Sequence, residues 1–257
     1  MPSRIAAAIA TCALSLGALA TGAGVATAAP PAPAAGTAGD APSLRPAIDA
    51  RAAAVDRCSY QVVRSHDSRY VYSVSGVFGG GARELTPQKE DYVRFSDDWR
   101  KVVQVDACAG ERGQVPTALR VTGKLDHPEH YDPSVPRTIH SNDLEPAASS
   151  VIPKAPGPAS VDRLDAATVR VTWKPAQGNP DQVVLMERKP FYSSEIGLWH
   201  PYTFQRNVPA GVTSMDRKLE RHSDIPPADR THSYWMRVVN GGFVSDLRSE
   251  KPVTVEP

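Results

Sequence analysis

The sequence has few cysteines and few aromatic residues, and neither sign of charge is in excess. Three Cys, 4 Trp, 8 Tyr and 5 Phe occur in 257 residues, and 29 Lys and Arg stand against 28 Asp and Glu. A nearly neutral chain lacks the basic surface that nucleic acids and anionic membranes attract. We therefore expect no nucleic-acid partner.

The sequence also lacks the signatures of most enzyme classes. It contains no nucleophile-elbow serine motif, and Gly79–Gly81 is not followed by the Lys and Ser or Thr of a phosphate-binding loop. Its paired carboxylates are too common a feature to identify a glycosidase. We expect no catalytic residues and no cofactor, so the chain is not predicted to be an enzyme.

The densest group of polar, metal-binding residue types is Asp126-His-Pro-Glu-His-Tyr-Asp132. Zinc-protease motifs need two histidines four positions apart on a helix. Here His127 and His130 are three apart and Pro128 lies between them, which argues against such a helix. We expect a solvated loop and no bound metal.

The first 28 residues have the pattern of a signal peptide. Arg4 precedes the apolar, uncharged run from Ile5 to Ala20, and the small residues Ala26 and Ala28 suit a cleavage site. The alternative is a membrane anchor, but a run of about 16 residues is shorter than the roughly 20 that a span needs. We expect a secreted, extracellular protein of bacterial type that does not insert in a membrane after processing.

Cleavage after residue 28 would leave Cys58 and Cys108 as the cysteines of the exported chain. Two cysteines in an oxidising compartment most simply form one disulfide bond. Closing this loop of about 50 residues stabilises the fold by roughly 4 kcal/mol in the chain-entropy model. A reactive thiol is the disfavoured alternative.

Composition divides the chain after the leader into four segments. Residues 29–54 are rich in Ala and Pro and predict a disordered tether, with a short helical turn allowed at 47–55. Residues 55–145 predict a disulfide-bonded β domain. Residues 146–158 predict a Pro-rich linker, and residues 159–257 a second β domain. Such a linker predicts two domains with separate cores.

The first β domain shows alternating β-branched and aromatic residues between Gly, Pro and Asp clusters, which is typical of strands. The predicted strands are 59–64, 70–75, 92–95, 101–106 and 119–122. An immunoglobulin domain would place a Trp about a dozen residues after its first Cys. Trp99 lies 41 residues after Cys58, so this domain stays unassigned.

The second β domain has a more specific pattern. Val169, Val171 and Trp173 alternate onto one face, as do Tyr234, Met236 and Val238, and a Pro-rich segment precedes them. Residues 156–257 therefore resemble a fibronectin type III domain. The resemblance implies an all-β, seven-stranded sandwich in which Trp173 and Tyr234 are structural core residues. It implies binding or spacing and no chemistry.

Residues 191–204 concentrate aromatic side chains, with five of the 17 in 14 positions. Exposed Tyr192, Trp199 and Tyr202 would form a binding surface for sugar rings or for a partner protein. In the alternative, Tyr202 and Phe204 alternate into the core of a strand.

These features predict a secreted, non-catalytic binding or interaction protein whose partner is an unknown extracellular protein or polysaccharide. The first alternative is an accessory carbohydrate-binding protein that uses residues 191–204. The second is a secreted hydrolase with its site in the N-terminal half.

Overall fold

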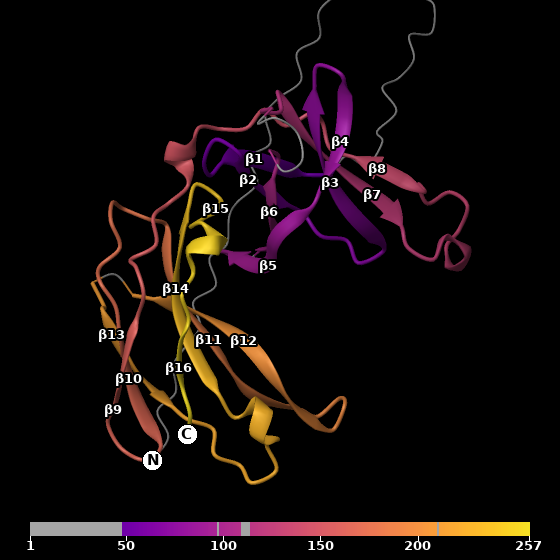
Figure 1. Cartoon of the computed structure of the whole chain (residues 1–257). Helices are drawn as coiled ribbons and strands as arrows, with labels where there is room; N and C mark the ends of the chain where they lie inside the picture. The colour runs from indigo at the N-terminus through magenta and orange to yellow at the C-terminus, as the bar shows by residue number, and fades with distance from the viewer. Residues whose placement is uncertain (1–47, 97, 109–113, 210) are drawn as a thin grey trace, which may run out of the picture. The chain divides into compact units, whose positions relative to one another are not determined.

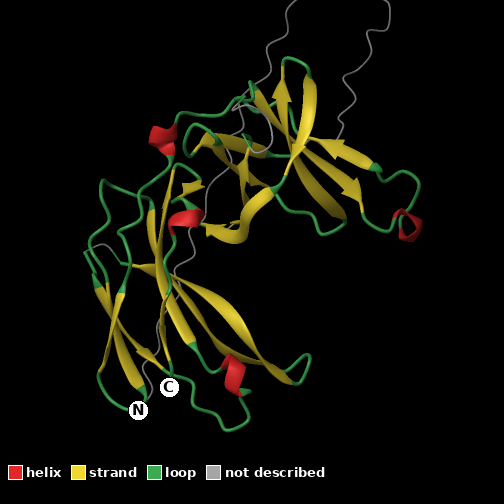
Figure 2. Ribbon diagram, in the orientation of Figure 1, coloured by secondary structure: helices red, strands yellow, loops and turns green. Residues whose placement is uncertain are grey.

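The computed structural model describes residues 48–96, 98–108, 114–209 and 211–257. These residues form antiparallel strands and four single-turn 3-10 helices (Figures 1 and 2). The predicted leader and residues 29–47 of the predicted tether lie outside the described residues. No helix in the described ranges has the length and apolar character of a membrane span. The described residues belong to one compact unit.

The N-terminal half is a sandwich of two four-stranded sheets. The first sheet has the order β1-β2-β6-β5 and consists of β1 (Ala50–Ala54), β2 (Ser59–Arg64), β6 (Asp98–Asp106) and β5 (Pro87–Phe95). The second has the order β4-β3-β7-β8 and consists of β4 (Gly81–Leu85), β3 (Tyr70–Phe78), β7 (Ala118–Leu125) and β8 (Thr138–His140). The all-β prediction for this half is confirmed.

The strand order of this half is that of immunoglobulin-like sandwiches. Lettering the strands along the chain gives sheets A-B-E-D and C′-C-F-G, which is the immunoglobulin arrangement. The Trp that is typical of immunoglobulin domains is absent from its usual place: the Trp of this half, Trp99, lies on β6 and is 49% exposed. For this reason the spacing between cysteine and tryptophan did not identify the strand order.

The predicted tether is wrong at its C-terminal end. Residues 50–54 form β1, and no helical turn occurs in the described residues 48–55. β1 pairs with β2 along its full length, and Ala52 and Ala53 are buried against the sheet. Alanine has a low preference for strands, so the pairing partner decides the conformation here.

The predicted disulfide bond between Cys58 and Cys108 is present, with its Cα atoms 5.2 Å apart. Cys58 directly precedes β2 and Cys108 follows β6, and Ser59 pairs with Asp106 in the adjacent ladder. The bond therefore ties neighbouring strands of one sheet and does not join the two sheets.

The C-terminal half is a sandwich of a three-stranded and a larger sheet. The first sheet has the order β13-β10-β9, from β13 (Ser214–Lys218), β10 (Thr168–Thr172) and β9 (Ser160–Arg163). The second has the order β12-β11-β14-β15, from β12 (Leu198–Val208), β11 (Gln182–Ser193), β14 (His232–Asn240) and β15 (Phe243–Val244), with β16 (Val253–Val255) also on β14.

This half is the fibronectin type III-like sandwich that the sequence predicts. β15 and β16 pair with opposite ends of β14 along the edge that β11 leaves open, so together they act as one interrupted strand. Counted in that way, three strands face four, and seven strands enclose one core. Trp173 is 5% exposed and Tyr234 is fully buried in that core.

The buried apolar residues of the two halves form three cores. One lies inside the N-terminal sandwich and one inside the C-terminal sandwich. The third, which we call the shared core, contains residues of both halves: Ala53, Val63, Val93, Val102, Val184, Met186, Trp235, Val239, Phe243, Val244 and Leu247. The prediction of separate cores is wrong, because β14 buries apolar side chains on both of its faces.

Polar side chains complete the contact around the shared core. The Gln61 amide donates to the carbonyl of Val244 at 3.1 Å and accepts from its N–H at 2.9 Å. Arg237 is fully buried and donates to Asp91 of β5 at 2.7 Å and to Glu250 at 2.6 Å. The bonds of Gln61 to Val244 and of Arg237 to Asp91 join the two halves, so these partners are present only while the halves are in contact.

The predicted linker is part of this assembly. The 3-10 helix η2 (Ser149–Val151) lies within it, and Val151 and Ile152 pack against the shared core. Ala147 forms a parallel bridge with Ala53 of β1. The linker is therefore held by hydrogen bonds and apolar contacts rather than extended between two independent bodies.

Candidate functional site

The aromatic stretch 191–204 lies on the long hairpin of β11 and β12 (Figure 1). The two strands pair without a register shift from Val183 and Val208 to Ser193 and Leu198. Gly197 closes the turn with a φ of 66°, a left-handed conformation that glycine adopts without steric cost. The hairpin extends the sheet beyond the last residue of β11 that pairs with β14, Arg188.

Large apolar side chains are exposed along this hairpin. Five of the 11 exposed large hydrophobic residues in the described parts of the chain fall between residues 191 and 202. They are Phe191 (40% exposed), Tyr192 (48%), Ile196 (59%), Leu198 (62%) and Tyr202 (48%). We call these five residues the hairpin surface. Such a concentration of apolar surface is typical of an interaction site.

The three predicted binding residues do not share one face of the hairpin. Tyr192 pairs with Trp199, so both project to the same side, and their rings are 5.5 Å apart. Tyr202 pairs with Lys189 and projects to the opposite side. There its ring lies 5.5 Å from Phe191 and 4.9 Å from Phe204.

Trp199 is less accessible than the residues of the hairpin surface. Its side chain is half-buried, and its ring centroid lies 5.3 Å from that of His222. The planes of Trp199 and Tyr192 are inclined by 59°. The hairpin therefore presents a tilted pair, Tyr192 and Trp199, on one side and a cluster of Phe191, Tyr202 and Phe204 on the other, rather than one flat row.

Buried charges anchor the base of the hairpin. Glu187 is fully buried and accepts hydrogen bonds from Arg206 at 2.7 Å and Arg217 at 2.8 Å. Burial acts to raise the pKa of Glu187, but the two arginines outweigh it and hold this pKa below its ordinary value. The paired carboxylate joins β11, β12 and β13, so this network is structural.

Tyr234 and His232 fill the core next to this network. His232 accepts a hydrogen bond at Nε2 from the Glu220 N–H at 3.0 Å, and its Nδ1 lies 3.4 Å from the Tyr234 hydroxyl. Burial lowers the pKa of His232 and raises that of Tyr234. A neutral histidine with Nδ1 protonated satisfies both contacts.

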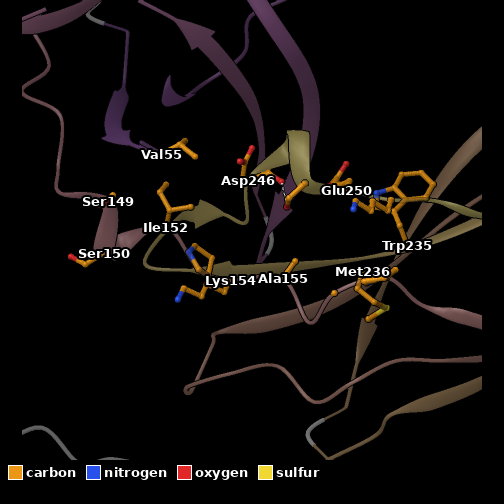
Figure 3. Close-up of a pocket in the computed structure, with 15 residues that line it drawn as sticks. Val55, Ser149, Ser150, Ile152, Lys154, Ala155, Trp235, Met236, Asp246 and Glu250 are labelled. Carbon is orange, nitrogen blue, oxygen red and sulfur yellow. Dashed lines mark hydrogen bonds between the residues drawn. The ribbon is translucent and has the colours of Figure 1, made fainter. Parts of the chain in front are cut away.

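A cavity of about 680 Å³ lies between the linker and the C-terminal half (Figure 3). Residues 149, 150 and 152–155 line one side, and Trp235, Met236, Asp246 and Glu250 line the other. Glu250 is already bound by Lys89 and Arg237, and Asp246 by Gln104 and Arg248. Among the described lining residues the cavity offers one unpartnered buried donor, Trp235 Nε1, and its acidic groups serve structural contacts.

His127, Glu129 and His130 lie in the loop between β7 and β8, outside the cavity in Figure 3. All three side chains are exposed, as expected for a solvated loop. A hydrolase would require such groups in a concave pocket, and this loop does not line that cavity.

No protein-family model matches the chain, and no curated protein matches it. Similar solved structures include a two-domain fibronectin type III segment of chicken tenascin, 10% identical, covering 81% of this chain and 98% of that chain, with a TM-score of 0.30. The FN1–FN3 domains of chicken CNTN1 are 11% identical, with 81% of this chain and 65% of that chain covered and a TM-score of 0.27. Because both TM-scores are low, the fold assignment rests on the strand order described above and not on these similarities.

Proposed function

We propose that this chain is an exported, non-catalytic binding protein that acts outside the cell, with the hairpin surface as its binding element. The observation that carries the proposal is the exposure of five large apolar side chains on 12 residues of one hairpin. The outer face of the same sheet is buried in the shared core, so it is not available to a partner.

A protein partner suits this geometry better than a polysaccharide. Carbohydrate platforms stack sugar rings on coplanar aromatic side chains, whereas Tyr192 and Tyr202 lie on opposite sides of the hairpin. Tyrosine and aliphatic residues on a projecting element are common anchors at protein interfaces. The disulfide bond supports an oxidising, extracytoplasmic location.

A capture experiment with matched variants tests this function. The secreted protein is immobilised and exposed to culture supernatant and to cell-wall material. We expect the wild type to retain a protein that the double variant Tyr192→Ser, Leu198→Ser loses. Trp99→Ser removes an exposed aromatic residue from the other half and should keep the retained protein.

All three proteins should melt at nearly the same temperature, because these side chains are exposed. Equal capture by wild type and double variant would refute the role of the hairpin. Retention of polysaccharide instead of protein would favour the carbohydrate-binding alternative.

A further inference from the structure

The loop between β7 and β8 folds into a single 3-10 turn, η1 (Pro128–His130). Proline fixes φ near the helical value and is suited to the first position of a turn. The His130 N–H donates to the carbonyl of His127 at 2.9 Å and closes the turn. His127 precedes the turn in a left-handed conformation, with a φ of 48°. Pro128 begins the turn, and the turn places the His130 ring next to that of His127, with centroids 5.3 Å apart.

The turn brings three metal-binding side chains together. His127 Nδ1 lies 3.2 Å from Glu129 Oε1, and His130 Nε2 lies 3.8 Å from the same oxygen. The three ligand atoms all fall within 4.8 Å of one another. The two imidazole rings are inclined by 20°, with centroids 5.3 Å apart.

These separations are close to those of a tetrahedral site. Ligands at about 2.0–2.2 Å from a tetrahedral Zn²⁺ lie about 3.4 Å from one another. The observed separations need small side-chain rotations to reach that value. All three side chains are about two-thirds exposed, so such rotations meet little steric resistance.

The charges around the turn favour a cation. The Glu129 carboxylate lies between the two histidines, and Asp126 adds a second carboxylate nearby. An Asp126 oxygen lies 3.9 Å from His127 Nε2, the ring nitrogen that remains free when Nδ1 binds a metal. A side-chain rotation that closes this gap to hydrogen-bond distance would let Asp126 orient His127, as carboxylates do for metal-binding histidines.

We propose that His127, Glu129 and His130 form a surface site for a divalent transition metal such as Zn²⁺, with Asp126 as a positioning residue. Two imidazoles and one carboxylate suit Zn²⁺, Cu²⁺ or Ni²⁺, whereas Ca²⁺ and Mg²⁺ prefer all-oxygen sites. Three protein ligands leave a fourth position for water. This site rests on different residues from those of the hairpin surface and is independent of the proposed binding function.

Calorimetric titration of the tag-free secreted protein with ZnCl₂, in a buffer that does not chelate metals, tests the site. We expect one zinc per chain. The variants His127→Ala and His130→Ala should each weaken binding more than about tenfold, the loss that even an outer-shell change causes. Asp126→Asn should weaken binding less than either. His140→Ala, which removes an exposed histidine from neighbouring β8, should bind zinc as the wild type does.

Metal analysis after dialysis gives a second readout, and the melting temperature without metal shows that each variant is folded. Titration with CaCl₂ should give no binding. Absence of stoichiometric zinc in the wild type would overturn the proposal. Unchanged zinc binding in the His127→Ala, His130→Ala double variant would overturn it as well.

Discussion

The two sandwiches of this protein have closely related strand orders but are stabilised by different means. The N-terminal sandwich has a largely aliphatic core, with valine at five of its 11 described buried positions and Tyr60 as its one fully packed aromatic residue, and a disulfide bond between adjacent strands. The C-terminal sandwich contains no cysteine. Its core includes Trp173, Tyr234 and Met236, and the buried carboxylate of Glu187 is paired with two arginines. A covalent tie and a large aromatic core thus support similar topologies.

The halves also differ in the surface that they leave to solvent. Each contributes one sheet face to the shared core, yet only the C-terminal half extends a hairpin with clustered exposed apolar residues. The N-terminal half instead exposes the histidine turn. The contact between the halves fixes which faces remain available to other molecules.

The largest effect is expected from breaking the contact between the halves. Arg237→Ala would leave Asp91 and Glu250 without their buried cation and should lower the free energy of unfolding by roughly 3–5 kcal/mol. Arg170→Ala is the matched control, because Arg170 pairs with Asp216 on the surface and should cost less than about 1 kcal/mol. Urea unfolding followed by tryptophan fluorescence measures both. Equal losses in the two variants would contradict the structural role of Arg237.

Removing the covalent tie should have a somewhat smaller effect. The double variant Cys58→Ser, Cys108→Ser should lose roughly 2–5 kcal/mol, because its unfolded chain regains the freedom of a 50-residue loop. Wild-type protein treated with a reductant in denaturant should unfold like the variant. If reduction leaves the urea midpoint unchanged, the disulfide does not contribute to stability as proposed.

The smallest effect concerns pH and distinguishes a buried histidine of one half from an exposed one of the other. Burial lowers the pKa of His232. The pKa of His66, which is largely exposed, is also lowered, by partial desolvation of its ring and by the nearby charges of Arg64 and Lys101. The unfolded chain takes up these protons near pH 6.5, before the folded protein does. Stability is therefore full above that pH and falls as the pH decreases below it.

Variants assign this pH dependence to one half or the other. His232→Gln should flatten the decline in unfolding free energy between pH 7.5 and 5.5 more than His66→Gln does, because only His232 is fully buried. A series of urea titrations over this range provides the measurement. A steeper or unchanged decline in His232→Gln would show that another group is responsible.

Much of the strand content was predictable from sequence because the signal is local. Residues 59–64 include a tyrosine and two valines, residue types that favour strands, and form β2 with the predicted bounds. The short strands β4, β8, β9 and β15 were missed. β4 and β9 contain few β-branched or aromatic residues, and β8 and β15 are only three and two residues long. Such strands form because a neighbouring strand supplies hydrogen bonds, and a sequence window contains no information about that neighbour.

The candidate sites were predictable to a different extent. Clustering of aromatic residues in 191–204 indicated the hairpin surface, but the exposed Ile196 and Leu198 were not singled out. Separation of Tyr202 from Tyr192 depends on the register set by the turn at Gly197. The exposed loop at residues 126–132 was predictable, but the 3-10 turn within it depends on the hydrogen bond from the His130 N–H to the His127 carbonyl, which no local sequence pattern indicates.

The sequence by itself determined the all-β class through local strand patterns, and the disulfide pair through the number of cysteines left after the predicted leader. The sandwich around Trp173 and Tyr234 was indicated by the resemblance of residues 156–257 to fibronectin type III domains. Only the tertiary structure decided that Trp235, Arg237 and Val239 on the other face of β14 would meet the N-terminal half. A strand that is apolar on both faces must be covered twice, but the identity of its second cover depends on long-range packing.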